Sequence, residues 1–132
     1  VIREFHEDRI VVYKEHQDGT VEIVLTKNGR KNALRFQIDE ITIKKPDKWD
    51  GKWRMVIFDI PERKRRARGA LRDKLKELGF KELQKSVFVY LYECEDEINF
   101  ITEVFEIRPY VRFLRVDFFT NEEQYKLKFK LY

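Results

Sequence analysis

The order of apolar and polar residues predicts a hairpin near the start of the chain. The stretches "RIVVYKEH" and "TVEIVLT" are rich in β-branched residues, and Val21, Ile23 and Leu25 alternate to give one apolar face. Between them, "QDGT" carries the Asp18-Gly19 pair, which suits a tight turn with positive φ. We therefore expect a β-hairpin. A short helix over "KNGRKNALRF", capped by Thr26, should follow it.

The next stretch, "QIDEITIKKPDKWDGKW", is typical of a linker or a short connecting strand. Ile41 and Ile43 alternate with polar residues, and then Pro46 and Gly51 interrupt the pattern. The predicted boundary divides the chain into a first part of residues 1–45 and a second part of residues 46–132.

The second part alternates between strand-like and helix-like patterns. "WRMVIFD" is an apolar run of strand length, and "PERKRRARGALRDKLKELGF" is an amphipathic helix between Pro61 and Gly79. Two short strands with a break near Gln84, a second amphipathic helix and a further strand, "YVRFLRVDFF", come next. The order β-α-β-β-α-β predicts an α+β fold of the ferredoxin-like kind, with both helices on one face of an antiparallel sheet.

The last residues, "YKLKFKLY", alternate strictly between apolar residues and lysines. This pattern predicts an extra C-terminal strand with one apolar face, which would need a partner in the same sheet or in a second copy of the chain. A short helix from Asn121 onward is the alternative.

Composition limits the class of protein. The 132 residues can form one domain plus an appendage, and no apolar run reaches the roughly 18 residues of a membrane span. A single cysteine, Cys94, excludes an internal disulfide framework and a Cys-rich zinc site, and it favours a cytoplasmic protein. The chain begins with Val1 rather than Met, which indicates a truncated product or an unusual start codon.

Charge is distributed unevenly. From Glu62 to Lys76 there are eight basic and two acidic residues, whereas from Glu93 to Glu106 there are six acidic residues and no Lys or Arg. Such asymmetry favours a polyanionic partner, although two solvated helix faces would have the same composition. The basic residues at the start of the first helix suit phosphates better than base edges. They are Arg63, Lys64, Arg65, Arg66 and Arg68, and Arg112 and Arg115 would extend this surface.

Asp59 is the main candidate for chemistry, because it ends the buried strand that precedes the basic helix. A carboxylate held there could bind a hard cation such as magnesium. No second acid lies at a suitable spacing, so a metal site would need Asp59 from each of two copies related by a two-fold axis. Alternatively, Asp59 caps the following helix or pairs with a nearby arginine.

Other catalytic patterns are absent. His6 and His16 are far along the chain from Cys94, and there is no Gly-rich phosphate loop. Cys94 is expected to be a small cap or core residue. Trp49 and Trp53 could stack on bases, but beside a turn they more often hold a linker against a domain.

The stretch "RMVIFDIPERKRRARGALRDKLKELGFKELQKSVFV" resembles the CRISPR-associated Cas-two family, with an apolar strand ending in Asp59, arginines at a helix start, and a strand beginning near Ser86. The resemblance covers about Trp53 to Phe118. It implies a ferredoxin-like homodimer in which Asp59 binds magnesium in an endonuclease for RNA or DNA, or a structural DNA-binding partner of the CRISPR integrase.

The preceding hairpin, the "LTKNGRKNAL" segment and the "KWDGKW" joint resemble the PaaX-type transcriptional repressors. In that family a winged-helix domain precedes a Cas-two-like domain, so residues 1–45 would be part of a winged helix. Its recognition helix and the C-terminal effector-binding region have no counterpart in this sequence.

Three hypotheses follow. The preferred one is a dimeric, nucleic-acid-binding module of a PaaX-like regulator, without turnover. The second is a magnesium-dependent nuclease of the Cas-two type that uses Asp59, and the third is a dimerisation scaffold that binds only protein.

Overall fold

A computed structural model of the chain describes residues 2–4, 11–15, 21–25 and 37–131. It divides into two compact units, residues 1–41 and residues 42–132, a few residues from the boundary that the sequence predicts.

The first unit contains a three-stranded antiparallel sheet. Its strands are β1 (Ile2–Glu4), β2 (Val11–Glu15) and β3 (Val21–Leu25), in that order across the sheet. The pairing of β2 with β3, in which Tyr13 lies opposite Ile23, confirms the predicted hairpin strands, and β1 was not predicted. The Asp18-Gly19 turn, Thr26 and the predicted helix over residues 27–36 lie outside the described residues, and residues 37–40 are helical.

The second unit has the element order that the sequence predicts. The predicted connecting segment is helical at residues 37–40 and irregular over residues 41–46, so the short connecting strand does not form. The elements are β4 (Trp53–Phe58), η1 (Glu62–Lys64), α2 (Arg65–Leu78), β5 (Lys81–Gln84), β6 (Val87–Tyr90), α3 (Glu95–Val104), η2 (Arg108–Tyr110), β7 (Val111–Val116) and α4 (Glu122–Lys128). The strands form one antiparallel sheet in the order β5-β6-β4-β7.

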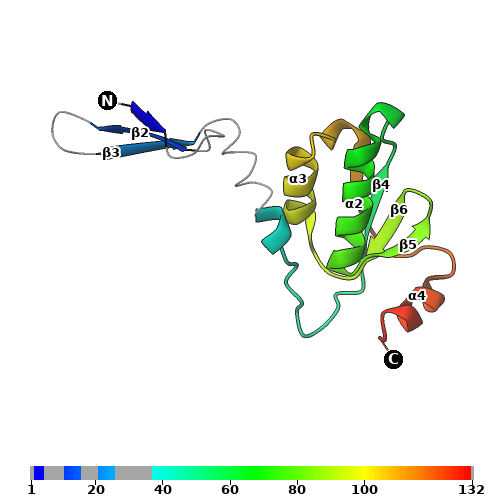
Figure 1. Ribbon diagram of the computed structural model, residues 1–132. Helices are drawn as coiled ribbons and strands as arrows, with labels where there is room; N and C mark the ends of the chain where they lie inside the picture. The colour runs from blue at the N-terminus through cyan, green and yellow to red at the C-terminus, as the bar shows by residue number, and fades with distance from the viewer. Residues whose placement is uncertain (1, 5–10, 16–20, 26–36, 132) are drawn as a thin grey trace. The chain divides into compact units, whose positions relative to one another are not determined.

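Helices α2 and α3 lie side by side on one face of this sheet (Figure 1). The core beneath them forms because apolar residues recur at helical spacing in the helices and at every second position in the strands. Leu71 and Leu75 of α2 and Ile98 and Ile101 of α3 are buried against this face. The strands contribute Val56, Phe58 and Phe88, with the Phe58 and Phe88 rings stacked at 6.0 Å.

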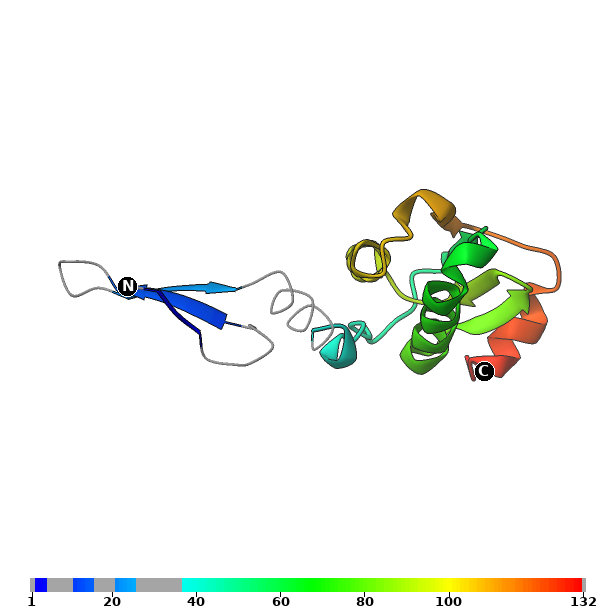
Figure 2. The ribbon, with the colours of Figure 1, turned by 45° about the horizontal axis from the view of Figure 1, so that its top comes forward.

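The other face of the sheet is partly covered by α4, as the turned view shows (Figure 2). Tyr125 of α4 is buried with Trp53, Met55 and Val89, and Phe129 packs against this group. The prediction of an extra C-terminal strand is therefore wrong, and the alternative helix from Asn121 is found. Helical spacing buries Tyr125 and leaves Leu127 63% exposed, whereas a strand would have placed both on one face.

The two tryptophans hold the segment before β4 against the rest of the second unit, the role that the sequence favours. Their rings lie 4.8 Å apart, Trp53 is fully buried, and the Nε1 of Trp49 donates to the carbonyl oxygen of Lys52 at 2.8 Å. Because the Trp53 ring is inaccessible, it cannot stack on a base.

Over the described part of the chain, no helix combines the length and the apolar character needed to cross a membrane.

Candidate functional site

The junction between β4 and η1 places Asp59 at the end of the sheet. Its neighbours Phe58 and Ile60 are buried, and Asp59 itself is exposed. The backbone is held from both sides, because the amide of Asp59 donates to the carbonyl of Tyr110 at 2.9 Å and the amide of Phe58 donates to the carbonyl of Ser86 at 3.0 Å. Asp59 is therefore exposed, as the sequence predicts, and it is the main chain that these hydrogen bonds hold.

The Asp59 carboxylate has no hydrogen bond or ion pair with a side chain among residues 37–131. Neither alternative role for Asp59 is found. The N-cap of η1 is Pro61, without a side-chain cap, and Arg68 bonds to Glu62 at 2.9 Å and to the carbonyl of Ile60 at 3.2 Å. Asp59 is thus available for an external group.

Two of the predicted phosphate-binding residues are tied to the protein. Arg63 donates to the Tyr110 hydroxyl at 2.8 Å and lies 5.9 Å from the centre of that ring. Lys64 donates to the carbonyl of Glu106 at 3.0 Å. These contacts fix the direction of the side chains and leave their positive charge uncompensated, since neither partner is charged.

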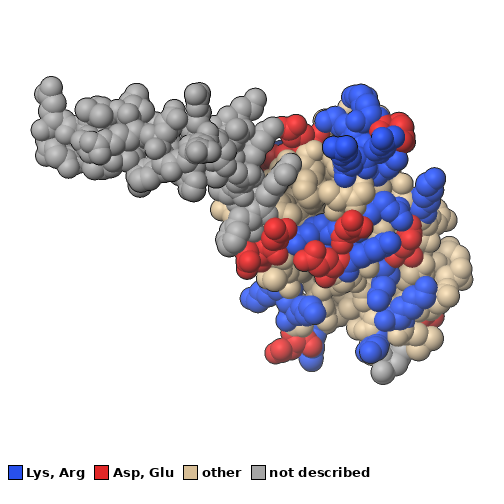
Figure 3. All heavy atoms as spheres, viewed as in Figure 1, with Lys and Arg blue, Asp and Glu red and all other residues tan. Residues whose placement is uncertain are grey.

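Arg65 and Arg66 are the freest cations of the group. Both are exposed, Arg65 is 3.8 Å from Glu62, and Arg66 has no ion pair within the described residues. Lys and Arg side chains gather where η1 and α2 begin, at the top of the view (Figure 3). We call Arg63, Lys64, Arg65, Arg66 and Arg68 the cationic cluster. The structure brings all five predicted residues to one end of α2.

The cluster occupies the end of α2 where cations are least favourable. The first turn of α2 has no acidic residue, and the positive end of the helix dipole lies there. The arginines and the dipole therefore add their positive potentials, and an external anion would relieve the repulsion.

A comparison with protein families supports the resemblance. The model of the PaaX protein central Cas2-like domain matches residues 46–127, more than half of the chain. The chain belongs to this family. No curated protein and no solved structure matches it. The PaaX central domain match begins just before β4 and ends within α4, so it includes Asp59 and the cationic cluster.

One predicted extension of the cluster is wrong. Arg115 lies opposite Arg54, at the far end of β4 from Asp59, and it is engaged with Glu93 at 2.6 Å and with Glu95 at 3.0 Å. Arg112 lies opposite Ile57 near the Asp59 end and is exposed. Of these two arginines, Arg112 is the one that lies near the Asp59 end of this PaaX-family domain.

A network of charges surrounds Arg54 and was not predicted from the sequence, in which Arg54 lies within an apolar run. Arg54 is 4% exposed and forms two bonds of 2.7 Å to Asp50, with Glu93 at 3.3 Å. Hydrogen bonding to Arg54 lowers the pKa of Asp50 to about 2, and hydrogen bonding to Arg115 lowers the pKa of Glu93 to about 2. The network is structural, because it satisfies a buried guanidinium group.

Cys94 is a core residue at the N-cap of α3 and makes no cap bond with its side chain. Burial raises the pKa of its thiol to about 12, so the thiolate needed for nucleophilic chemistry is not formed at neutral pH.

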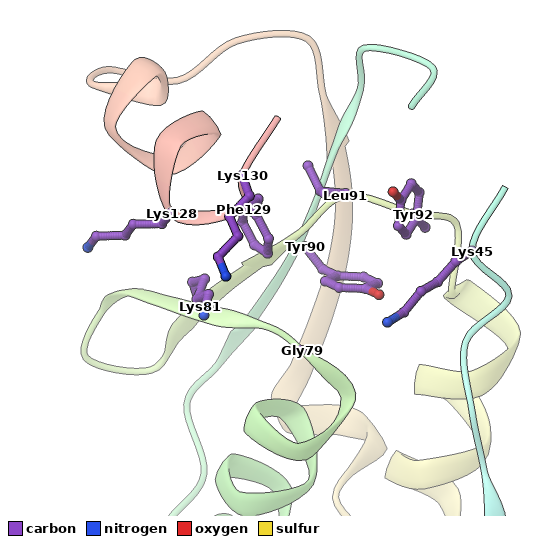
Figure 4. A pocket seen from close by; sticks show the side chains of 9 residues that line it. All are labelled: Lys45, Gly79, Lys81, Tyr90, Leu91, Tyr92, Lys128, Phe129 and Lys130. Carbon is purple, nitrogen blue, oxygen red and sulfur yellow. The ribbon is translucent and has the colours of Figure 1, made fainter. Parts of the chain in front are cut away.

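A second site, which the sequence did not indicate, lies at the C-terminal end of α2. It is a pocket of about 260 Å³ lined by lysines and aromatic rings. Its residues are Lys45, Gly79, Lys81, Tyr90, Leu91, Tyr92, Lys128, Phe129 and Lys130 (Figure 4). The sequence gives no sign of this pocket, because its residues come from four separate segments of the chain.

Proposed function

We propose that this chain is a nucleic-acid-binding part of a PaaX-like transcription regulator, and that the cationic cluster contacts phosphates. The observation that carries the proposal is the pair of exposed arginines, Arg65 and Arg66, at the positive end of α2. Glu62 lies 3.8 Å from Arg65, and Arg66 has no ion pair within the described residues. Membership of the PaaX central domain family makes a regulatory role the favoured context.

Phosphates fit this surface for two reasons. One guanidinium group can bind two phosphate oxygens at once. Long exposed side chains at one helix end can contact the phosphates of a nucleic-acid backbone without recognising bases. The interaction should release counterions, so that each phosphate contact lowers the log–log slope of affinity against salt by about 0.9.

The test is a salt titration of duplex DNA binding, followed by fluorescence anisotropy. We expect a steep loss of affinity with salt, and the double variant Arg65→Gln/Arg66→Gln should reduce the slope by about two. Lys76→Gln is the matched control, because Lys76 is exposed in the last turn of the same helix. An equal effect of both changes, or binding that does not respond to salt, would refute the proposed surface.

Three finer features belong to this proposal. We assign the second unit a ferredoxin-like fold, which the element order and the strand order support. The β2–β3 hairpin is proposed to be the wing of a winged helix. The working unit is proposed to be a homodimer, for which β7 supplies a sheet edge that pairs with no further described strand. Light scattering after size exclusion tests the dimer, and a mass of 16.2 kDa at working concentration would exclude it.

A magnesium-dependent nuclease is the second candidate, favoured by the free and exposed carboxylate of Asp59. Residues 37–131 contain no group of three metal-ligating side chains, so Asp59 fits as one half of a site shared by two copies. Bound magnesium would supply an activated water for phosphodiester hydrolysis. Cleavage of labelled RNA and DNA that is lost in Asp59→Asn, but not in Asp117→Asn, would support this function. Cleavage that survives Asp59→Asn would exclude Asp59.

A further inference from the structure

The pocket at the end of α2 gathers positive charge from distant parts of the sequence. Lys45 comes from the linker before β4, Lys81 begins β5, and Lys130 follows α4. Lys128 also lines the pocket, but its ammonium group lies 4.6 Å from the centre of the Tyr125 ring and points away from the other side chains (Figure 4). The charge within the pocket therefore comes from three lysines.

No carboxylate neutralises these three lysines. The lining contains no Asp or Glu, and Lys45, Lys81 and Lys130 have no ion pair with another residue of 37–131. Lysines that line one pocket without a carboxylate among them favour an anionic ligand.

Aromatic rings form the apolar wall. Tyr90 is buried, its ring stacks on Phe80 at 5.0 Å, and its pKa is raised mainly by burial, so its hydroxyl stays protonated and can donate. Phe129 lies 6.1 Å from Tyr90, and the Lys81 ammonium is 5.9 Å from the Phe129 ring centre. The Tyr90 hydroxyl and the Lys45 ammonium lie on the same side of the pocket (Figure 4). A flat ring could pack against this wall while its anionic group meets the lysines.

The cation type narrows the choice of anion. Planar carboxylates are best matched by the fork of an arginine, and the pocket contains no arginine. Lysine acts as a point charge that suits phosphate, which offers three oxygens and a charge near −2 to several ammonium groups. Phosphate together with a flat ring is the chemistry of a nucleotide.

We propose that this pocket binds a nucleoside phosphate, either free or at the end of a nucleic-acid strand, with its phosphate on Lys81 and Lys130 and its base against the half-buried ring of Phe129. The site is separate from the cationic cluster, because α2 has 14 residues and its two ends are about 20 Å apart. Either proposal can therefore fail without the other.

Calorimetric titration of the whole chain with ADP, inorganic phosphate and adenosine tests the chemistry. We expect ADP to bind, phosphate to bind more weakly, and adenosine not to bind. Lys81→Gln and Lys130→Gln should each weaken ADP binding about tenfold, the effect of losing one charge-assisted hydrogen bond. Lys85→Gln, in the exposed turn between β5 and β6, should leave it unchanged.

The source of the ligand is tested with tetranucleotides that carry or lack a 5′-phosphate. Tighter binding of the phosphorylated strand than of ADP assigns the pocket to strand ends, and the reverse order assigns it to free nucleotides. The urea midpoint of each variant checks that it is folded, and its duplex binding checks the cationic cluster separately. Failure of ADP and of both tetranucleotides to bind, equal binding of adenosine and ADP, or the same affinity in the lysine variants and the control would overturn the proposal.

Discussion

The indole Nε1 of Trp53 donates a hydrogen bond of 2.8 Å to the Glu122 carboxylate, which joins the first residue of β4 to the first residue of α4. Trp53 is fully buried, so Glu122 satisfies a donor that has no access to water. The ring also packs edge-on against Phe119 at 5.0 Å. The attachment of α4 to the sheet thus combines apolar contact with one specific polar bond.

Replacement of Glu122 should therefore separate these two contributions. Glu122→Ala leaves the indole donor buried and unpaired, which should lower the free energy of unfolding by about 1–3 kcal/mol. Glu122→Gln keeps an acceptor oxygen and should lose less than half of that amount. Urea unfolding followed by tryptophan fluorescence measures both. Similar losses in the two variants would mean that the hydrogen bond is not what holds α4.

Removal of Asp50 should lower the free energy of unfolding, because the buried Arg54 loses a charged partner. Asp50→Ala deletes two bonds of 2.7 Å, while Glu93 and the carbonyls of Lys52 and Leu91 remain. Because the Asp50 side chain is half exposed, we expect a loss of about 1–2 kcal/mol in the free energy of unfolding, less than for a fully buried pair. Asp47→Ala, an exposed change in the same linker, is the control. Equal unfolding free energies for the two variants would contradict the prediction.

The same network predicts how stability depends on pH. The pKa values of Asp50 and Glu93 are about 2 in the folded protein, below their ordinary values of 3.8 and 4.5. The unfolded chain therefore takes up protons first, so the stabilisation is complete above about pH 5 and is lost as the pH falls through 4 toward 2. Solvent screening limits each contribution to about 1 kcal/mol. Urea midpoints should fall between pH 5 and 3, and the decrease should be smaller in Glu93→Gln. An equally steep decrease in that variant would exclude Glu93 as a source.

Two glycines of the second unit, Gly79 and Gly69, should respond in opposite ways to replacement by alanine. Gly79 ends α2 with φ of 107°, and an added Cβ would lie 3.0 Å from Cε1 of Tyr90. Gly79→Ala should therefore destabilise the protein by at least about 1 kcal/mol. Gly69 lies within α2 with open space around it, so Gly69→Ala should stabilise the protein by up to about 1 kcal/mol. Thermal melting compares them, and shifts of the same sign would refute the structural reason.

Patterns of the central part of the chain were enough to predict its elements. The apolar run of β4, the helical spacing of Leu71 and Leu75, and the stop at Gly79 each point to one structure. The pairing order of the strands follows from that element order, because the helical connections restrict which strands become neighbours.

The C-terminal segment was mispredicted because its sequence fits two periods. Residues 125, 127, 129 and 131 alternate as in a strand, but Tyr125 and Phe129 are also four residues apart, as on one helix face. The charges held a signal that favours the helix, since Glu122 and Glu123 occupy the first turn and Lys126 and Lys128 the last.

The candidate sites differ in how much of each could be predicted from the sequence. Asp59 and the cationic cluster are close in sequence, so their neighbourhood could be predicted. The other contacts depend on how the strands are arranged in space. They are the ion pairs of Arg54 with Asp50 and Glu93, the ion pair of Arg115 with Glu93, and the grouping of lysines around the pocket. Sequence patterns do not contain that information.

The backbone hydrogen bonds made by the amides of Phe58 and Asp59 have a thermodynamic consequence. Since Tyr110 and Ser86 already hold this turn, the main chain that carries the carboxylate is preorganised, and a ligand that meets it has little main-chain entropy to remove. Recognition at this end of the sheet would be governed by electrostatics and desolvation, with rates set by encounter and not by rearrangement.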